Sequence, residues 1–249
     1  ISGGLVGSEM CIRDRITKDK VFIITGASAG IGSELAYQLA KKGAHVVCAA
    51  RTMTKLETVC KNIKDKNGSA IPIQADITNK DQCEKVISQT IKTFNRIDGL
   101  VLNAGVSMWA KFDKIKDVSF FKTIMDTNYL GSVYCVHAAL PFLKKTRGKI
   151  ISCSTGQAIM GFPNHSGYVA SKHALHGFLS TIRMENKEEI TVLEAVLSWI
   201  KGTDLRNNSF GADGKKQEGM TRKHTKEAIP LTQCVETIIT AIEKDLKTV

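Results

Sequence analysis

The amino-acid sequence predicts a doubly wound α/β domain, in which helices cover both faces of a parallel sheet. Apolar runs of strand length alternate with amphipathic segments of helix length from residue 20 to the end of the chain. Parallel strands need crossover connections of this length, which are right-handed and usually helical. A glycine-rich turn separates the first run from the first helix, and 249 residues with 43% apolar content suffice for one large core.

The individual elements follow from the hydrophobic pattern in chain order. The first strand is the apolar run 20–25, and the first helix covers 31–42 because Ile31, Leu35 and Leu39 share one helical face. The next strand–helix units repeat this pattern. The remaining strands are predicted at 44–50, 69–75, 99–102, 149–153 and 190–197, and the remaining helices at 55–66, 82–94, 119–143, 168–185 and 234–247.

Three segments do not fit the alternation. Residues 1–15 (ISGGLVGSEMCIRDR) have no periodicity and resemble a translated sequencing-adapter read-through, so we expect a non-native leader followed by one domain over 16–249. A native signal or membrane anchor upstream would then have been lost. Residues 203–230 are polar and aperiodic, and we expect a flexible segment on the substrate side. After the last helix we expect a final seventh strand to be missing through truncation.

Composition limits the function classes. Lys and Arg number 35 against 24 acidic residues, a net charge of +11 that favours anionic partners, but the basic clusters are short and lack interleaved aromatic residues. Nucleic-acid binding is therefore not predicted. Seven cysteines without a CxxC pair or a His/Cys cluster predict neither a metal site nor a disulfide scaffold. We expect a cytoplasmic protein, or one at the cytosolic or ER membrane if a lost N-terminal segment anchored it.

The glycine-rich turn predicts a nucleotide-binding site. The sequence TGASAGIG places Gly26, Gly30 and Gly32 between a strand and an amphipathic helix. Glycines allow a tight turn and a close approach of the backbone, and the unpaired N–H groups of the helix N-terminus can bind a pyrophosphate. The alternative is that the glycines serve the turn alone.

The end of the second strand predicts which dinucleotide is bound. Ala50, Arg51 and Thr52 stand where a carboxylate would accept hydrogen bonds from an adenosine ribose. A guanidinium instead offers a bidentate contact to phosphate, so the sequence favours NADP over NAD. The alternative is that Arg51 lies in solvent.

A tyrosine and a lysine four residues apart predict proton transfer. Tyr168 and Lys172 share one helical face, and a neighbouring ammonium favours the phenolate and lowers the tyrosine pKa. Tyr168 could then exchange a proton with a substrate oxygen. Tyr37 and Lys41 have the same spacing, but they lie on the polar face of the first helix. Only Tyr168 follows a strand end, where ligands of open α/β sheets bind.

With these motifs the chain resembles a short-chain dehydrogenase/reductase over residues 18–247. The resemblance also includes Asp76 after the third strand, the sequence LNAG at 102–105 and Asn128 in the long helix. It implies a Rossmann sheet of strand order 3-2-1-4-5-6, NADP(H) as cofactor, and a homodimer or homotetramer formed through the long helices around Asn128 and Tyr168. It assigns cofactor contacts to Gly26, Ser28, Gly30, Ile31, Gly32, Arg51, Thr52, Asp76, Ile77, Asn103, Ala104, Gly105, Tyr168, Lys172, Ile200 and Thr203.

The resemblance implies a catalytic set of Asn128, a hydroxyl residue, Tyr168 and Lys172. Counting 13 residues back from Tyr168 gives Thr155 as the hydroxyl residue, with Ser154 as the alternative. A threonine hydroxyl can donate the same hydrogen bond to a carbonyl oxygen. Asn128 would hold a water that links Lys172 to solvent, or it is an ordinary polar residue that caps a bent helix.

The segment after the sixth strand departs from the family pattern. Ser198 and Trp199 replace a Pro-Gly pair, while Thr203 remains and could anchor the cofactor carboxamide together with the Ile200 N–H. Trp199 cannot adopt every glycine conformation.

The residues after Thr203 most resemble the dehydrogenase/reductase member 7 subgroup, and next the hydroxysteroid 11-beta dehydrogenase subgroup. We therefore expect an NADP(H)-dependent oxidoreductase that interconverts a lipophilic carbonyl and alcohol, such as a retinoid, steroid or quinone. The alternative is a nucleotide-binding scaffold or sensor of the same fold with impaired catalysis.

Overall fold

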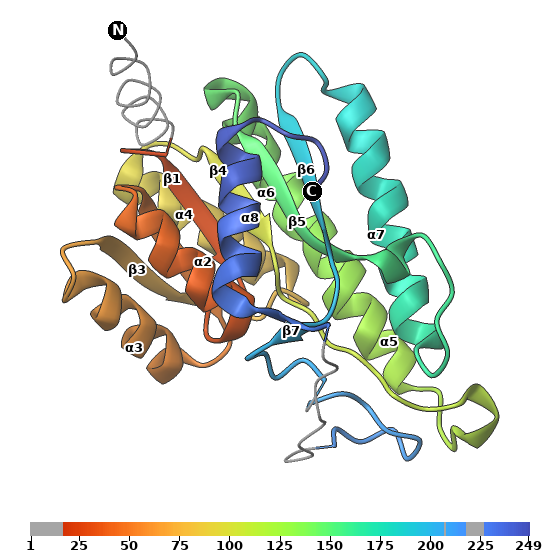
Figure 1. The fold of residues 1–249 in the computed structure, drawn as a ribbon. Coiled ribbons are helices and arrows are strands. Elements are labelled where there is room, and N and C mark those ends of the chain that lie inside the picture. The colour runs from red at the N-terminus through yellow and green to blue at the C-terminus, as the bar shows by residue number, and fades with distance from the viewer. Residues whose placement is uncertain (1–16, 207, 218–226) are drawn as a thin grey trace, which may run out of the picture.

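A six-stranded parallel sheet forms the centre of the protein (Figure 1). The computed structural model describes residues 17–206, 208–217 and 227–249, so the predicted leader 1–15 and part of the segment 203–230 lie outside the described residues. The strand order β3-β2-β1-β4-β5-β6 confirms the predicted order. The strands are β1 Val21–Thr25, β2 His45–Ala50, β3 Ser69–Gln74, β4 Gly99–Leu102, β5 Lys149–Thr155 and β6 Thr191–Leu197.

Helices connect the strands and cover both faces of the sheet, as the alternating pattern predicts (Figure 1). They are α2 Gly30–Lys41, α3 Met53–Lys64, α4 Lys80–Phe94, α5 Phe120–Met125, α6 Gly131–Thr146, α7 Ser166–Glu185 and α8 Leu231–Glu243. Three shorter turns, η1 Phe112–Lys114, η2 Asp126–Leu130 and η3 Gly156–Ala158, and a two-stranded pair of β7 Ile200–Lys201 and β8 Ile229–Pro230 complete the described elements.

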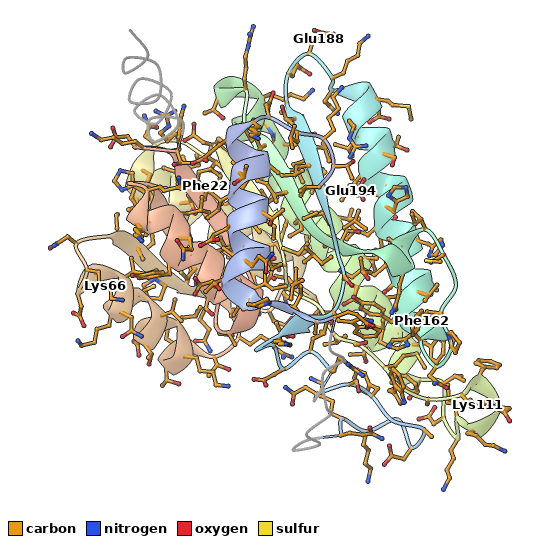
Figure 2. All side chains as sticks on the ribbon, in the orientation of Figure 1. Phe22, Lys66, Lys111, Phe162, Glu188 and Glu194 are labelled. Atoms are coloured by element: carbon orange, nitrogen blue, oxygen red, sulfur yellow. The ribbon has the colours of Figure 1, made fainter. Side chains whose placement is uncertain are left out.

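The core has two layers, because successive side chains of each strand point to opposite faces. Phe22 and Ile24 pack with α2, α3 and α8, whereas Val21 and Ile23 pack with α4, α6 and α7. Figure 2 shows side chains filling the space between the sheet and the helices, with Phe22 labelled among them. A third, smaller cluster lies beyond the carboxyl end of the sheet and contains Met108, Phe120, Ile124, Tyr168 and Phe210.

The predicted helix over 119–143 contains a π turn. Residues Asp126–Leu130 form this wider turn between α5 and α6, with Asn128 inside it. The hydrophobic period alone does not distinguish a single π turn from a continuous α-helix, so the sequence predicts one uninterrupted element. The turn places the Asn128 side chain in the protein interior, where only 1% of the residue is exposed.

The last three residues run along β6, at the position of the seventh strand that was expected to be missing. Glu194 N–H donates to Lys247 O at 3.0 Å, Val249 N–H donates to Glu194 O at 3.2 Å, and Val196 N–H donates to Val249 O at 2.7 Å. The bridge between Glu194 and Thr248 is parallel. Residues 247–249 therefore form a parallel bridge to β6 at the position of the expected seventh strand.

The described part of 203–230 contacts the loop after β4. Trp109 N–H donates to Phe210 O at 2.8 Å, Phe210 N–H donates to Ser107 O at 2.9 Å, and Lys116 N–H donates to Ala212 O at 3.0 Å. These hydrogen bonds bring the two loops together beyond the carboxyl ends of the strands. None of the helices within the described ranges has the length and apolar character needed to cross a lipid bilayer.

Asp98 fixes the amino-terminal edge of the sheet between β1 and β4. Its carboxylate accepts hydrogen bonds from the Val21 N–H at 2.9 Å and from Arg96 Nε at 2.8 Å, and Lys20 Nζ lies 3.3 Å away. Burial alone would raise the pKa of Asp98, but these hydrogen bonds and charges outweigh burial and lower it.

Candidate active site

A cavity of about 740 Å³ lies at the carboxyl ends of the parallel strands. Ligands of open α/β sheets bind at this edge, where the strand order reverses between β1 and β4. The cavity extends from the glycine-rich turn to Tyr168 on α7 and is large enough for a dinucleotide and a small substrate. Every residue that the sequence proposed for the site lines it except Gly32 and Asn128, which lie behind its wall.

The glycine-rich turn is tightly packed against the loop after β4. Gly26 has a φ of +66°, and a Cβ atom on Gly32 would lie 2.5 Å from the Gly26 carbonyl oxygen. Asn103 Nδ2 donates to the carbonyl oxygens of Thr25 at 3.0 Å and Gly26 at 3.1 Å. The side chain that the resemblance assigns to the ribose therefore also fixes the turn. The turn leaves the N-terminus of α2 open to the cavity, which fits a pyrophosphate.

The far end of the cavity carries positive charge. Arg51 and Lys55 line it directly after β2, and the Arg51 side chain is exposed. The Arg51 carbonyl oxygen accepts a hydrogen bond from Gln74 Nε2 at 2.8 Å, which fixes the backbone here. Asp76 faces this end, but its Oδ1 accepts hydrogen bonds from the N–H and hydroxyl of Thr78. The two cations fit the 2′-phosphate of NADP.

Tyr168 and Lys172 lie in the same cavity, one turn apart on α7. Only 7% of Tyr168 and 6% of Lys172 are exposed. Lys172 Nζ donates to the Cys153 carbonyl oxygen at 3.2 Å and lies 5.8 Å from the centroid of the Tyr168 ring. The hydrogen bond to β5 holds the ammonium beside the tyrosine, so the predicted proximity of the two groups is present.

The pKa of Tyr168 differs from the sequence-based expectation. Burial raises it, with a smaller contribution from the neighbouring Cys153 thiol, and burial lowers the pKa of Lys172. We expected the ammonium to lower the tyrosine pKa, but removing the phenolate from water has the larger effect here. Tyr168 is therefore a neutral phenol at physiological pH and can donate a proton.

Asn128 does not line the cavity but is hydrogen-bonded to residues that lie next to it. Its Nδ2 donates to the Val106 carbonyl oxygen at 2.9 Å and to Ser171 Oγ at 2.9 Å, and its Oδ1 accepts from the Val106 N–H at 2.8 Å. Ser171 directly precedes Lys172, so Asn128 joins the π turn, the loop after β4 and α7. This geometry shows a side chain that positions α7.

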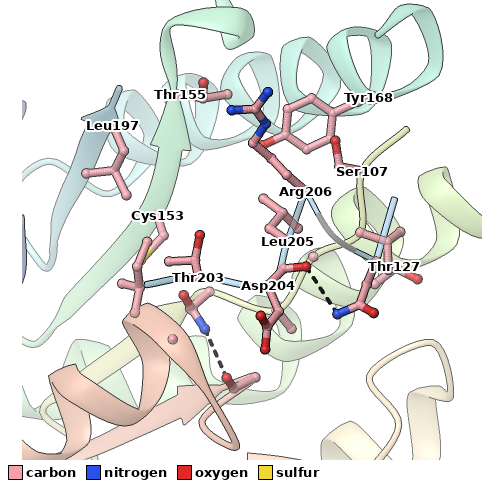
Figure 3. A pocket seen from close by; sticks show the side chains of 18 of the residues that line it. Ser107, Thr127, Cys153, Thr155, Tyr168, Leu197, Thr203, Asp204, Leu205 and Arg206 are labelled. Atoms are coloured by element: carbon pink, nitrogen blue, oxygen red, sulfur yellow. Dashed lines mark hydrogen bonds between the residues drawn. The ribbon is translucent and has the colours of Figure 1, made fainter. Parts of the chain in front are cut away.

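The two candidate hydroxyl residues both line the cavity at the end of β5. Thr155 Oγ1 accepts a hydrogen bond from the Gln157 N–H at 3.4 Å, and 7% of Ser154 is exposed. Successive strand residues point to opposite faces, so the two hydroxyls approach the cavity from different sides. The position of Thr155 at the same end of the cavity as Tyr168 can be followed in Figure 3.

Trp199 stands at a glycine position of the family pattern, but its backbone is not strained. Trp199 is absent from the residues with positive φ among those the structure describes, and Gly202 carries the left-handed conformation instead, with φ of +84°. Ile200 lies in β7 and Thr203 follows the Gly202 turn, and both line the cavity. The Trp199 side chain contacts the ring of Phe162, with 5.9 Å between centroids.

Several residues around Tyr168 were not singled out from the sequence. His165 is 3% exposed, and its ring centroid lies 6.1 Å from that of Tyr168. Ser107, Thr127, Arg206 and Lys216 also line the cavity. The only signal for them is position, because each follows a strand end or lies within a few residues of a recognised motif. Within the described part of the chain, no group of three or more His, Cys, Asp or Glu side chains could hold a metal ion.

The fold and cavity define a nucleotide-binding α/β domain with a buried tyrosine–lysine pair at the end of its ligand cleft. Residues 20–213 match the family described as short chain dehydrogenase. The chain belongs to this family.

Relatives and solved structures share this fold. The chain is 36% identical over 197 residues to 11-beta-hydroxysteroid dehydrogenase 1A of Arabidopsis thaliana, covering 79% of this chain and 56% of the relative. It is 38% identical over 208 residues to 11-beta-hydroxysteroid dehydrogenase-like 2 of the same plant, covering 82% of this chain and 67% of the relative. The chain thus spans little more than half of the first of these relatives.

A similar solved structure is an alcohol dehydrogenase from the archaeon Thermococcus sibiricus complexed with 5-hydroxy-NADP. It has a TM-score of 0.79 and 22% identity, and the match covers 92% of this chain and 94% of that one. A metagenomic short-chain oxidoreductase in complex with NADP has a TM-score of 0.77 and 22% identity, covering 94% and 96%. At this identity the two structures support the fold.

Proposed function

We propose that this protein is an NADP(H)-dependent oxidoreductase that interconverts a lipophilic carbonyl compound and its alcohol. The observation that carries the proposal is the position of Tyr168 and Lys172 in one cavity with the glycine-rich turn. The names of the Arabidopsis relatives and the NADP in the two similar structures support the substrate class and the cofactor.

The cofactor contacts that we propose follow the length of the cavity. Arg51, with Ser28, would hold the 2′-phosphate, and the N-terminus of α2 would hold the pyrophosphate. Asp76 and Ile77 would meet the adenine, and Ile200 and Thr203 would orient the nicotinamide carboxamide. NADPH supplies the hydride for the carbonyl carbon.

The residues around Tyr168 would handle the proton. Thr155, or Ser154 in its place, would donate a hydrogen bond that polarises the substrate carbonyl. As the carbonyl carbon accepts the hydride, the C=O electron pair moves to oxygen, which takes the phenolic proton of Tyr168. Lys172 would stabilise the resulting phenolate, and Asn128 would hold α7 in place through Ser171. Because burial raises the pKa of Tyr168, the phenol carries its proton before the transfer.

A panel of aldehydes, ketones, quinones and steroids tests the proposal through NADPH oxidation. We expect turnover with at least one class and a much smaller kcat for Tyr168→Phe, with NADPH still bound by that variant. Tyr37→Phe is a matched control, because Tyr37 lies on α2 outside the cavity. Tight NADPH binding with no turnover on the whole panel, and no effect of Tyr168→Phe, would instead support the scaffold or sensor.

We also propose a homodimer or homotetramer, with α5–α6 and α7 as the contacting helices. This rests on the family resemblance. Light scattering coupled to gel filtration measures the mass directly, and a monomer at all concentrations would contradict it.

A further inference from the structure

Arg206 occupies an aromatic enclosure at the substrate end of the cavity. Its guanidinium carbon lies 4.5 Å from the centroid of the Trp199 ring and 5.6 Å from that of Trp109. Figure 3 shows its guanidinium at the end of the cavity that holds Thr155 and Tyr168. Stacking on aromatic faces is a common way to fix an arginine without neutralising its charge.

The guanidinium has no anionic partner in the part of the chain that the structure describes. Its Nε is buried and has no hydrogen-bond acceptor there, and no described carboxylate forms an ion pair with it. The Arg206 backbone carbonyl, by contrast, accepts a hydrogen bond from the hydroxyl of Ser209 at 2.9 Å. Burying a charged donor without an acceptor is unfavourable, so a site of this kind is suited to an anionic ligand.

Ring contacts connect this arginine to the proposed proton donor. His165 packs edge-on against Trp109 with 4.9 Å between ring centroids, and its ring centroid also lies 5.3 Å from that of Phe162 and 6.1 Å from that of Tyr168. The enclosure therefore continues from the guanidinium to the phenol. An anion bound by Arg206 would belong to a molecule whose other end lies near Tyr168.

The charges at this end of the cavity also favour an anion. Lys216 lines the same cavity, and its ammonium lies 5.7 Å from the centroid of the Phe210 ring. Asp204 is the one described carboxylate at this end, and its backbone carbonyl accepts from Asn208 Nδ2. Arg51 and Lys55, which fit the cofactor phosphate, stand at the opposite end.

We propose that Arg206 binds a carboxylate of the carbonyl substrate, so that the preferred substrates are oxo or aldehyde acids with an apolar or aromatic body. The carboxylate would form a bidentate pair with the guanidinium, and the apolar body would pack between Trp199, Phe162 and Tyr168. This inference rests on the proposed oxidoreductase function and specifies its substrate class. Arg206 is then a specificity-determining residue.

A matched pair of aldehydes tests the inference. 4-Formylbenzoate and its methyl ester present the same aldehyde on the same ring and differ in the negative charge. We expect kcat/KM for the acid to exceed that for the ester in the wild type. In Arg206→Gln the acid should lose roughly tenfold or more, while the ester changes by less than about twofold. Lys201→Gln removes one positive charge from an exposed residue outside the cavity and should alter neither value.

A binding experiment separates this inference from catalysis. The chain has two tryptophans, Trp109 and Trp199, and both flank Arg206, so tryptophan fluorescence reports on the enclosure. Benzoate should produce a saturable fluorescence change in the wild type and in Lys201→Gln, with NADP⁺ present, and none in Arg206→Gln. This result would support the anion site even if the protein reduced neither aldehyde. The absence of reduction would then contradict the proposed function but not the anion site.

Two results would overturn the inference. One is an unchanged ratio of acid to ester, and unchanged benzoate affinity, in Arg206→Gln. The other is a weakened NADPH affinity in Arg206→Gln with benzoate binding intact, because the guanidinium would then serve the cofactor.

Discussion

A single methyl group in the glycine-rich turn should weaken both nucleotide binding and the stability of the fold. In Gly32→Ala the added Cβ would lie 2.5 Å from two atoms, the Gly26 carbonyl oxygen and Asn103 Nδ2. Neither atom can move freely, because Gly26 is backbone in a left-handed turn and the Asn103 amide is committed to two carbonyl oxygens. The turn must therefore shift away from α2.

The expected magnitudes follow from this geometry. Overpacking of this kind destabilises a protein by about 1–3 kcal/mol. The displaced turn should also misplace the phosphate contacts and weaken NADPH binding by roughly tenfold or more. A tenfold loss of affinity corresponds to about 1.4 kcal/mol of binding free energy. NADPH fluorescence titration measures the affinity, and thermal unfolding without nucleotide measures the stability.

The same substitution elsewhere provides the control. Gly177 lies exposed in the middle of α7, and a Cβ there would meet no atom within 4 Å. Gly177→Ala should stabilise the protein by about 0.5–1 kcal/mol, because alanine is the better helix former, and leave NADPH affinity unchanged. Wild-type NADPH affinity and stability in Gly32→Ala would refute the packing argument for the turn.

Three further predictions address the cofactor, the catalytic hydroxyl and acid stability. Arg51→Asp should shift the ratio of kcat/KM for NADPH over NADH by roughly tenfold or more toward NADH, because a carboxylate repels the 2′-phosphate; an unchanged ratio would remove Arg51 from the phosphate site. Thr155→Val should reduce kcat far more than Ser154→Ala, and the reverse order in the same NADPH oxidation assay would assign the role to Ser154. Asp98→Asn should destabilise the protein by about 1–3 kcal/mol at neutral pH in urea unfolding. The pKa of Asp98 in the folded protein lies below the unfolded value of about 3.9. The contribution of Asp98 to stability is therefore complete above that value and is lost as the pH falls through the folded pKa. The difference in unfolding free energy between wild type and variant should thus disappear in acid.

The sheet and its order could be predicted because its signals are local and repeated. Each strand is a short apolar run followed by a helix with one apolar face, and the turn around Gly26 marks where the strand order reverses. The π turn at Asn128 and the two-residue strands β7 and β8 were missed, because such short elements depend on tertiary hydrogen bonds. The hydrophobic periodicity of the sequence therefore does not predict them.

The site was predicted unevenly for a similar reason. Tyr168 and Lys172 are four residues apart, so helical geometry alone brings them together. Trp109 lies in the loop after β4, far in sequence from Trp199 and Arg206, and only the fold brings it beside Arg206. The pKa of Tyr168 was predicted in the wrong direction because burial, which sets it, is a property of the packed structure.

The π turn at Asp126–Leu130 has a consequence for insertions and deletions. It contains one more residue per turn than an α-helix, and Asn128 within it is tied by its amide to Val106 and Ser171. Deleting one residue here would restore regular helix geometry but rotate α5 by about 100° relative to α6. Insertions and deletions among natural relatives should therefore accumulate in the outer loops. Between Asn128 and Tyr168, we expect them only in the segments that connect the helices and strands.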